Sequence, residues 1–220
     1  MNLFAQLQQA LASVYDLGGP VVAVLLATSV VTVALILYKL WQFRAAGVGR
    51  HRLLGDAVEA WDRGDRAKAA MLIDESRSYL APVIRLACKD RDGFHADRAD
   101  AEAEDRFAHL ERGLSALDIV AQLAPLMGLF GTVLGMIDAF RALQNAGTSV
   151  DPSLLAGGIW VALLTTAAGL AVAMPTSLIL NWFEARMRRD RVFANRALRV
   201  IFAPGTGSPE GTARLRAHGT

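Results

Sequence analysis

The sequence predicts an all-α membrane protein with three transmembrane helices and long helices that extend into the cytoplasm. Its 220 residues are 53% hydrophobic, with a mean hydropathy of +0.31. The apolar residues come in blocks rather than alternating with polar ones. A spanning helix needs about 20 apolar residues at roughly 1.5 Å rise each. Three blocks reach that length, and residues 152–183 contain no charged residue.

Residues 1–19 are expected to form an extracytoplasmic amphipathic helix. Apolar side chains recur there at helical spacing, at Leu3, Phe4, Leu7, Leu11 and Val14. Such a pattern is typical of a helix lying on a membrane surface. Residues 1–17 contain no Lys or Arg, so the basic start of a secretory signal peptide is missing. Gly18, Gly19 and Pro20 should end this helix.

The first transmembrane helix is predicted over residues 20–41. It ends in Tyr38, Lys39 and Trp41, which we interpret as an aromatic and basic anchor at the membrane interface. Arg44, Arg50 and Arg52 follow, whereas no basic residue precedes the span. Cytoplasmic flanks carry the excess of Lys and Arg. The N-terminus is therefore predicted to be periplasmic, and the segment after the span cytoplasmic.

A cytoplasmic helical region is predicted over residues 42–112. An apolar stripe runs from Leu53 to Trp61 and is interrupted at Arg63-Gly64-Asp65. A second helical pattern covers residues 67–87, with Pro82 as a kink or boundary, and residues 91–93 (Arg-Asp-Gly) suggest a turn. Residues 98–112 show no obvious break before the second span. We therefore expect one long helix from the cytoplasm through the membrane to about Leu143.

The rest of the chain completes a three-span topology. We predict a second transmembrane helix at 113–142, a short periplasmic loop at 143–152 and a third transmembrane helix at 153–183. A basic cytoplasmic helix at 184–202 and a disordered tail at 203–220 follow. The cluster from Arg186 to Arg199 is a second positive-inside signal, and it agrees with the first.

Small residues gather on one side of the second and third spans. At about 100° per residue, they form a stripe roughly 120° wide on each helix. On the second span the stripe contains Ala121, Ala124, Pro125, Gly128, Gly131, Thr132 and Gly135. On the third it contains Gly158, Ala162, Thr165, Thr166, Gly169 and Ala173. The opposite side carries bulkier residues such as Trp160, Leu163, Leu164 and Leu170. Membrane helices associate through such close packing.

Composition argues against several other classes of protein. The net charge of +2 gives no nucleic-acid footprint. Cys88 is the only cysteine, so no disulfide framework or cysteine metal site is expected. The four histidines are far apart in sequence, and we expect them on the surface. The cytoplasmic region has no glycine-rich phosphate loop or nucleophile–base set, so we predict that the chain is not an enzyme and needs no cofactor.

The second and third spans resemble the ExbB/TolQ/MotA family of ion-driven motor subunits. The resemblance rests on AP-x-x-GL-x-GTV-x-GMI-x-AF (124–140) followed by GI-x-x-AL-x-TT-x-x-GL-x-VA-x-P (158–175). Three spans look like ExbB or TolQ, because the flagellar member has four. The phrase LERGLS (110–115) is more similar to ExbB.

The resemblance implies a homopentamer around a central pore that holds a dimer of a single-span partner similar to ExbD. The partner would carry a membrane aspartate that takes and releases protons, with a TonB-like periplasm-spanning protein as a further partner. Carried over by position, Thr132, Thr165 and Thr166 would line the ion pathway. The helix-packing positions would be Pro125, Gly128, Gly131, Gly135, Gly158, Ala162, Gly169, Ala173 and Pro175. Back-bonding to a carbonyl of the same helix is the alternative reading of each threonine.

One position departs from the family pattern. Many members have a glutamate where this chain has Val161, so the third span contributes no carboxylate. The proton carrier at mid-membrane would then come from the partner, from water, or from Asp118 and Asp138, which we interpret as solvated end residues.

The resemblance leaves several functions open. The first is a subunit that energises TonB-dependent transport at the bacterial inner membrane with the proton motive force. The second is a TolQ-like subunit for envelope maintenance, and the third is a non-conducting membrane scaffold. A solute transporter is less favoured, because we find no internal repeat. Protons are the expected coupling ion, with sodium as the alternative.

Overall fold

The computed structural model describes residues 3–89, 96–145 and 152–203. These residues form seven helices and no strand. Three of the helices are long and apolar enough to cross a membrane, over Gly19–Ala45, Leu114–Asn145 and Leu155–Phe202. The prediction of an all-α protein with three transmembrane helices is therefore confirmed. The predicted turn at 91–93, most of the predicted periplasmic loop and nearly all of the predicted tail lie outside the described residues.

The chain divides into two compact units, which we describe separately. Unit 1 comprises residues 1–37 and 113–181, and unit 2 comprises residues 38–112 and 182–220. Helices α1 (Leu3–Ala45) and α7 (Pro152–Phe202) contribute residues to both units, whereas α6 (Leu114–Asn145) lies within unit 1.

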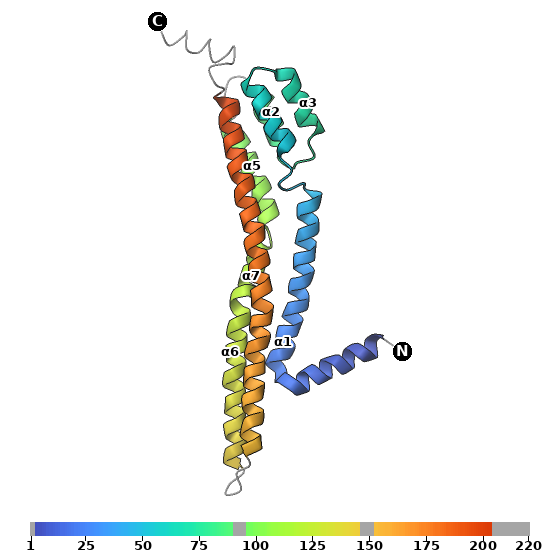
Figure 1. Ribbon diagram of the computed structural model, residues 1–220, viewed down its shortest axis with the longest axis vertical. Helices are drawn as coiled ribbons and strands as arrows, with labels where there is room; N and C mark the ends of the chain where they lie inside the picture. Colours follow the sequence, from blue (N-terminus) through green and yellow to red (C-terminus); the bar gives the residue numbers. More distant parts are fainter. Residues whose placement is uncertain (1–2, 90–95, 146–151, 204–220) are drawn as a thin grey trace. The chain divides into compact units, whose positions relative to one another are not determined.

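A break in α1 separates its N-terminal part from the membrane-spanning part. Gly19 has φ 66° and ψ −168°, a conformation that residues with a Cβ atom rarely adopt. Pro20 follows, and a proline disfavours helical geometry at the residue before it. The predicted end of the first helix is thus found at Gly19, and Figure 1 shows α1 changing direction there. The side chains of residues 3–18 are outside the described set.

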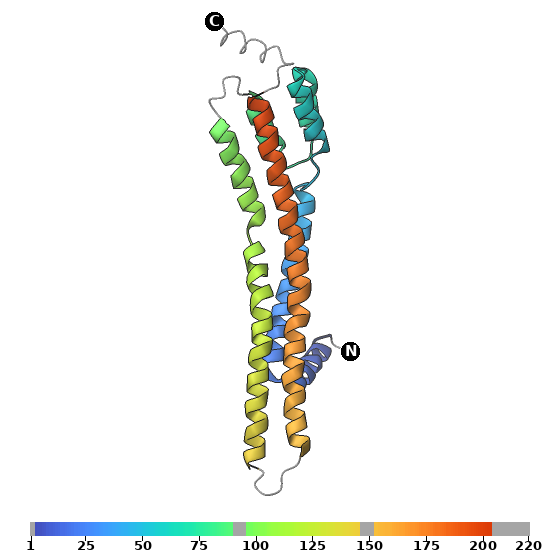
Figure 2. The same cartoon turned by 60° about the vertical axis from the view of Figure 1, so that its left-hand side comes forward.

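In unit 1, α6 and α7 run side by side, as Figures 1 and 2 both show. The membrane part of α1 joins them through a small apolar cluster. Val21 and Leu25 of α1 are buried with Ala124 of α6 and Ala173 of α7. Large apolar side chains remain on the outer surfaces of these helices, for example Val30, Phe130 and Leu163, each more than half exposed. An apolar exterior is what a helix needs in lipid.

Unit 2 adds four shorter helices to the ends of α1 and α7. They are α2 (Arg52–Asp62), α3 (Arg66–Glu75), α4 (Ala81–Lys89) and α5 (Ala96–Glu111). The interruption predicted between α2 and α3 is present: Gly64 has φ 85°, and the Asp65 carboxylate accepts a hydrogen bond from the Lys68 amide at 3.1 Å. This is a typical N-cap. Pro82 lies in the first turn of α4, where a missing N–H costs nothing.

The expectation of one long helix through residues 98–143 is wrong. Helix α5 ends at Glu111 and α6 begins at Leu114, because Gly113 adopts a left-handed conformation with φ 86°. A glycine in this conformation just after a helix satisfies the last carbonyls and stops propagation. By contrast, the third span and the basic segment after it form one uninterrupted helix, α7.

We predict that Gly113→Ala destabilises the protein by about 1–2 kcal/mol, because a Cβ atom is strained at left-handed φ. Gly113→Asn should cost less, since Asn tolerates this region. The measurement is unfolding in mixed detergent, followed by circular dichroism. Gly157→Ala is the control: a Cβ there meets nothing within 4 Å. Equal stability of Gly113→Ala and Gly157→Ala would show that the break imposes no such constraint.

Candidate functional site

Small residues of α6 and α7 make a close helix contact in unit 1. We call it the small-residue interface; it consists of Gly128, Gly131, Gly135, Ala162, Thr165 and Gly169. A Cβ atom built on Gly131 would lie 2.6 Å from the Thr165 Cβ, and one on Gly169 would lie 2.5 Å from the Ala124 carbonyl oxygen. Real Cβ atoms do not approach so closely, so the two backbones can meet here only because these side chains are absent.

The same geometry extends along the pair of helices. A Cβ on Gly128 would lie 2.9 Å from the Thr165 carbonyl oxygen, and one on Gly135 would lie 3.2 Å from the Ala162 amide nitrogen. A Cβ on Gly158 would overlap the side chain of Ala139. The predicted stripes of the second and third spans therefore face each other within one chain. Ala162 and Ala173 are both 4% exposed.

Thr165 is enclosed in the small-residue interface. Its side chain is 1% exposed, and its hydroxyl lies 2.7 Å from the Ala162 carbonyl oxygen and 3.3 Å from the Gly128 carbonyl oxygen of α6. One hydroxyl proton can serve only one of these acceptors at a time. Within a single chain Thr165 thus links α6 to α7, and its predicted pore-lining role, which concerns an assembly, stays a prediction.

Thr166 and Thr132 lie at the margin of the interface and are partly exposed. The Thr166 hydroxyl donates across to the Gly128 carbonyl at 3.4 Å, so Thr165 and Thr166 share one acceptor on α6. The Thr132 hydroxyl donates to the Leu129 carbonyl of its own helix at 2.6 Å. Because each proton is already donated to a carbonyl, the lone pairs of these hydroxyls remain as acceptors.

The other predicted positions are less enclosed. Pro125 and Pro175 lie inside α6 and α7; Pro125 is partly exposed and Pro175 is exposed. Val161, which stands where many members of the family have a glutamate, is partly exposed. The bulky side of α7 is open, with Trp160 and Leu163 each 63% exposed.

The two aspartates of the second span lie away from the small-residue interface. Asp118 and Asp138 are exposed, and Asp138 lies 4.0 Å from Arg141 of the same helix. In the described part of the chain, no group of three His, Cys, Asp or Glu side chains is placed to hold a metal ion. The chemistry that unit 1 can offer is therefore that of hydroxyls and backbone carbonyls at a close helix contact.

Sequence reasoning missed a buried polar cluster in unit 2, and the expectation of surface histidines is wrong for His51. Its side chain is 11% exposed, and its Nε2 lies 2.8 Å from Oδ2 of Asp190, which is 2% exposed. The Tyr79 hydroxyl and the Gly49 amide donate to the same oxygen at 3.0 and 3.2 Å. Burial and the neighbouring Asp190 carboxylate raise the pKa of Tyr79.

A signal for Asp190 was present in the sequence. Buried positions recur along α7 every three or four residues, and in its basic half they include Phe183, Met187, Asp190, Ala194 and Ala197. Asp190 thus takes a place in an apolar series, where a carboxylate needs partners. The basic residues around it hid this pattern, because they suggest a uniformly solvated segment.

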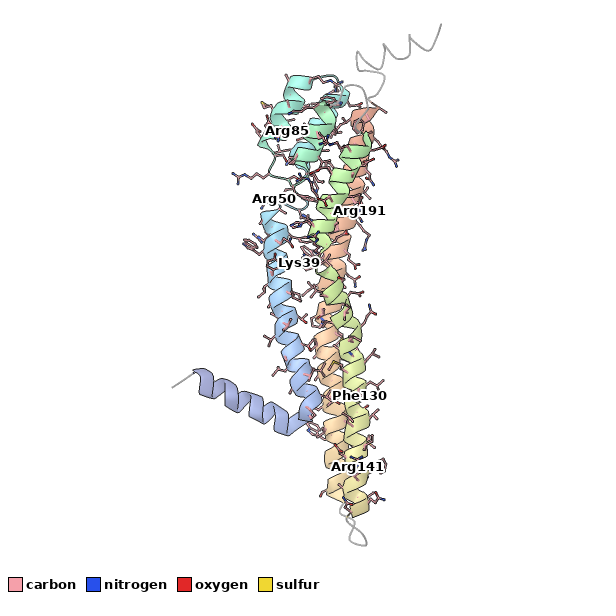
Figure 3. The ribbon with its side chains drawn as sticks, turned by 180° about the vertical axis from the view of Figure 1, so that it is seen from behind. Lys39, Arg50, Arg85, Phe130, Arg141 and Arg191 are labelled. Atoms are coloured by element: carbon pink, nitrogen blue, oxygen red, sulfur yellow. The ribbon has the colours of Figure 1, made fainter. Side chains whose placement is uncertain are left out.

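Lys39, part of the predicted anchor at the membrane interface, has buried partners within unit 2. It is 4% exposed, and its ammonium donates to the Leu110 carbonyl at 3.1 Å and to the Gln42 side chain at 2.7 Å. Leu110 belongs to the last turn of α5, where carbonyls lack helical partners. Lys39 (Figure 3) therefore fixes the end of α5 to α1 within unit 2.

Comparison with known proteins matches residues 75–193 to the model described as the MotA/TolQ/ExbB proton channel family. This match covers more than half of the 220 residues. The chain belongs to the MotA/TolQ/ExbB proton channel family. The matched region includes all of α6 and most of α7, and so the whole small-residue interface.

Individual relatives carry the name ExbB. The chain is 29% identical over 199 residues to the biopolymer transport protein exbB1 of Vibrio cholerae, covering 86% of this chain and 84% of that protein. It is 29% identical to ExbB of Neisseria meningitidis serogroup A, covering 78% and 86%. With an ExbB homologue of Methanothermobacter thermautotrophicus it shares 31% identity over 64% of this chain, and it spans half of that relative's length. The chain is therefore an ExbB-like member of this family.

We predict that Gly131→Ala destabilises the protein by about 1–3 kcal/mol, as overpacking of a tight contact does. Thr165→Gly should also destabilise it, because glycine weakens a helix interior. The double variant should lose less than the sum of the two single losses, since removing the Thr165 side chain makes room for the new methyl group. Unfolding in mixed detergent measures all three. Strict additivity would contradict the close contact.

Proposed function

We propose that the chain is an ExbB-like proton-channel subunit of the bacterial inner membrane. With an ExbD-like partner it converts the proton motive force into mechanical work that energises TonB-dependent outer-membrane transport. The observation that carries the proposal is the small-residue interface, which coincides with the region matched to the proton channel family. In this proposal the N-terminus is periplasmic, the C-terminus is cytoplasmic, and five copies surround a dimer of the partner.

The proposed proton carrier is a carboxyl group of the partner, because the described part of α7 offers no carboxylate within the predicted span. Thr132 and Thr166 supply the sites that this carboxyl group visits. Their protons are given to the carbonyls of Leu129 and Gly128, so their lone pairs can accept a hydrogen bond from a protonated acid. If the hydroxyl rotates away from its carbonyl, it can donate to the ionised acid instead.

Protonation decides whether the partner stays or moves. An ionised carboxylate at mid-membrane is costly, so it is held where hydroxyl donors can solvate it. Once protonated it is neutral and can pass the apolar surface between sites. One proton that crosses 100 mV releases roughly 2.3 kcal/mol, which is enough to bias a step between near-equivalent positions.

In this mechanism the tight packing of α6 on α7 sets the distance between the hydroxyls that meet the partner. Thr165 is enclosed and bonded to Gly128, so it fixes the spacing at which Thr132 and Thr166 stand. We propose that Thr165 acts as a spacer in each copy, while Thr132 and Thr166 meet the partner. Sodium is the alternative coupling ion.

A non-conducting membrane scaffold is the second candidate, and Val161 favours it, because a carboxylate is absent where many members of the family have one. A TolQ-like role in envelope maintenance is the alternative client for the same motor. Proton flux into vesicles that contain the chain and an ExbD-like partner separates a channel from a scaffold. Flux that requires both proteins supports the channel, and its absence with an assembled complex supports the scaffold.

We predict that Thr132→Val combined with Thr166→Val abolishes proton flux in such vesicles while the complex still assembles. Valine keeps the shape of threonine but removes the hydroxyl lone pairs. Thr28→Val is the matched control, because Thr28 lies on α1 and donates to the Val24 carbonyl at 2.9 Å in the same manner. The measurements are the flux of a pH-sensitive dye and the mass of the purified complex. Undiminished flux in the double variant would count against the proposed pathway.

A further inference from the structure

The buried cluster around Asp190 connects three separate parts of unit 2. One Asp190 oxygen meets the Gly49 amide from the link after α1, the Tyr79 hydroxyl from the segment before α4, and His51 Nε2 from the start of α2. Asp190 lies beyond the predicted third span, which ends at residue 183. We call these groups, with Ser78, the His51–Asp190 cluster.

The ring of His51 is held so that both protonation states fit. It stacks on Phe193 with centroids 4.8 Å apart and planes 10° apart. Nδ1 lies 3.0 Å from the Ser78 hydroxyl oxygen, and Nε2 faces Asp190. A carboxylate has no proton to donate, so an ion pair with Asp190 requires a proton on Nε2. Nδ1 can then accept from Ser78 when His51 is neutral or donate to it when His51 is charged.

The surrounding charges leave His51 as the direct ionic partner of Asp190. In the described part of unit 2, the nearby guanidinium groups are engaged elsewhere. Arg186 donates to the Val48 carbonyl at 3.2 Å. Arg191 (Figure 3) pairs with Glu104 at 3.1 Å and lies 3.5 Å from Glu111.

The remaining charged and titratable neighbours do not compete with His51. Arg106 binds Glu102 at 2.7 Å and the Tyr79 carbonyl at 3.0 Å. The raised pKa of Tyr79 keeps its hydroxyl a neutral donor near neutral pH. Histidine is the side chain that ordinarily changes charge between pH 5 and 8. The charge state of His51 therefore decides whether the 2.8 Å contact between Nε2 and Asp190 is an ion pair.

The segment attached by this cluster is short and tightly fitted. Gly47 and Gly49 have φ 68° and 74°. A Cβ on Gly47 would lie 2.6 Å from the Arg77 carbonyl oxygen, and one on Gly49 would overlap the guanidinium of Arg186. Local turn bonds join the amides of Gly47, Val48 and Arg50 to the carbonyls of Arg44, Phe43 and Gly47. Longer-range bonds join the segment to the rest of unit 2: the Gly49 amide to Asp190, the Val48 carbonyl to Arg186, and the Ala46 carbonyl to the Tyr79 amide at 3.1 Å.

We propose that His51 is a pH-responsive positioning residue, whose protonation tightens the attachment of residues 47–51 to α7 through Asp190. This inference rests on the proposed function in one respect: the orientation that puts unit 2 in the cytoplasm, where the channel releases its protons. Acidification there would charge His51 and stiffen the connection after the first membrane helix. Protons that the channel delivers to the cytoplasm would thereby regulate the mobility of residues 47–51.

The test is hydrogen exchange of residues 46–52 in the purified full chain, read by mass spectrometry in detergent between pH 5.5 and 8. Rates are corrected for the intrinsic effect of pH. Protonated His51 forms an ion pair with the carboxylate that accepts the Gly49 amide hydrogen bond. Loss of this pair should weaken the attachment by about 1 kcal/mol, so we expect protection of this segment to fall about fivefold as pH rises. In His51→Gln, which keeps a donor and an acceptor but does not titrate, protection should be independent of pH.

Tyr79→Phe is the matched control. It removes one donor to Asp190 but leaves His51 in place, so protection should be lower at every pH while its pH dependence persists. Constant protection in the unmodified chain overturns the proposal, even if a variant fails to fold. An unchanged pH dependence in His51→Gln overturns it as well. The exchange experiment uses neither a partner protein nor proton flux. Its result can therefore be interpreted even if the proposed channel function fails its own test.

Discussion

The close approach of α6 and α7 is the constraint on which the rest of unit 1 depends. In lipid, burying one apolar side chain against another gains little, so helices hold together through short-range packing and interhelical hydrogen bonds. The absence of Cβ atoms at Gly131 and Gly169 brings the backbones together. Thr165 then reaches the Gly128 carbonyl across the contact. The hydroxyls of Thr165 and Thr166 reach α6 because of that spacing.

The same contact explains why the outer surfaces are bulky. The small residues lie between α6 and α7. Large apolar side chains such as Leu126, Phe130 and Trp160 are exposed on the other sides of these helices. Lipid or further copies of the chain can cover these surfaces without any loss of the internal contact. Each helix therefore uses its small-residue side for packing within the chain and its bulky side for contacts with lipid or other chains.

Much of unit 1 could be predicted from the sequence, because one physical rule dominates it. Long apolar blocks must be helices in lipid, and small residues at helical spacing must mark the close side. That rule located Gly128, Gly131 and Gly169. It could not tell whether Thr165 faces the neighbouring helix or a pore, because both alternatives lie on the same stripe. The burial of Thr165 in the structure shows that it is enclosed within one chain.

Unit 2 was harder to predict, since its structure depends on contacts between distant segments. Gly113, where unit 1 resumes after α5, was also overlooked, because a single glycine in a helical pattern is often tolerated; its positive φ becomes visible only in three dimensions. His51 and Asp190 are 139 positions apart in sequence, and nothing local pairs them. The spacing of Asp190 from Met187 and Ala194 is typical of a buried face, but this pattern was not recognised, because the charge of the segment was given more weight than its periodicity.

The most direct test of the central claim is the structure of the chain assembled with an ExbD-like partner. The account predicts a guest helix enclosed by several copies, with its acidic side chain within hydrogen-bonding distance of Thr132 or Thr166. Thr165 should remain buried between α6 and α7 of each copy. An assembly in which Thr132 and Thr166 face lipid, or in which no guest helix is enclosed, would contradict it.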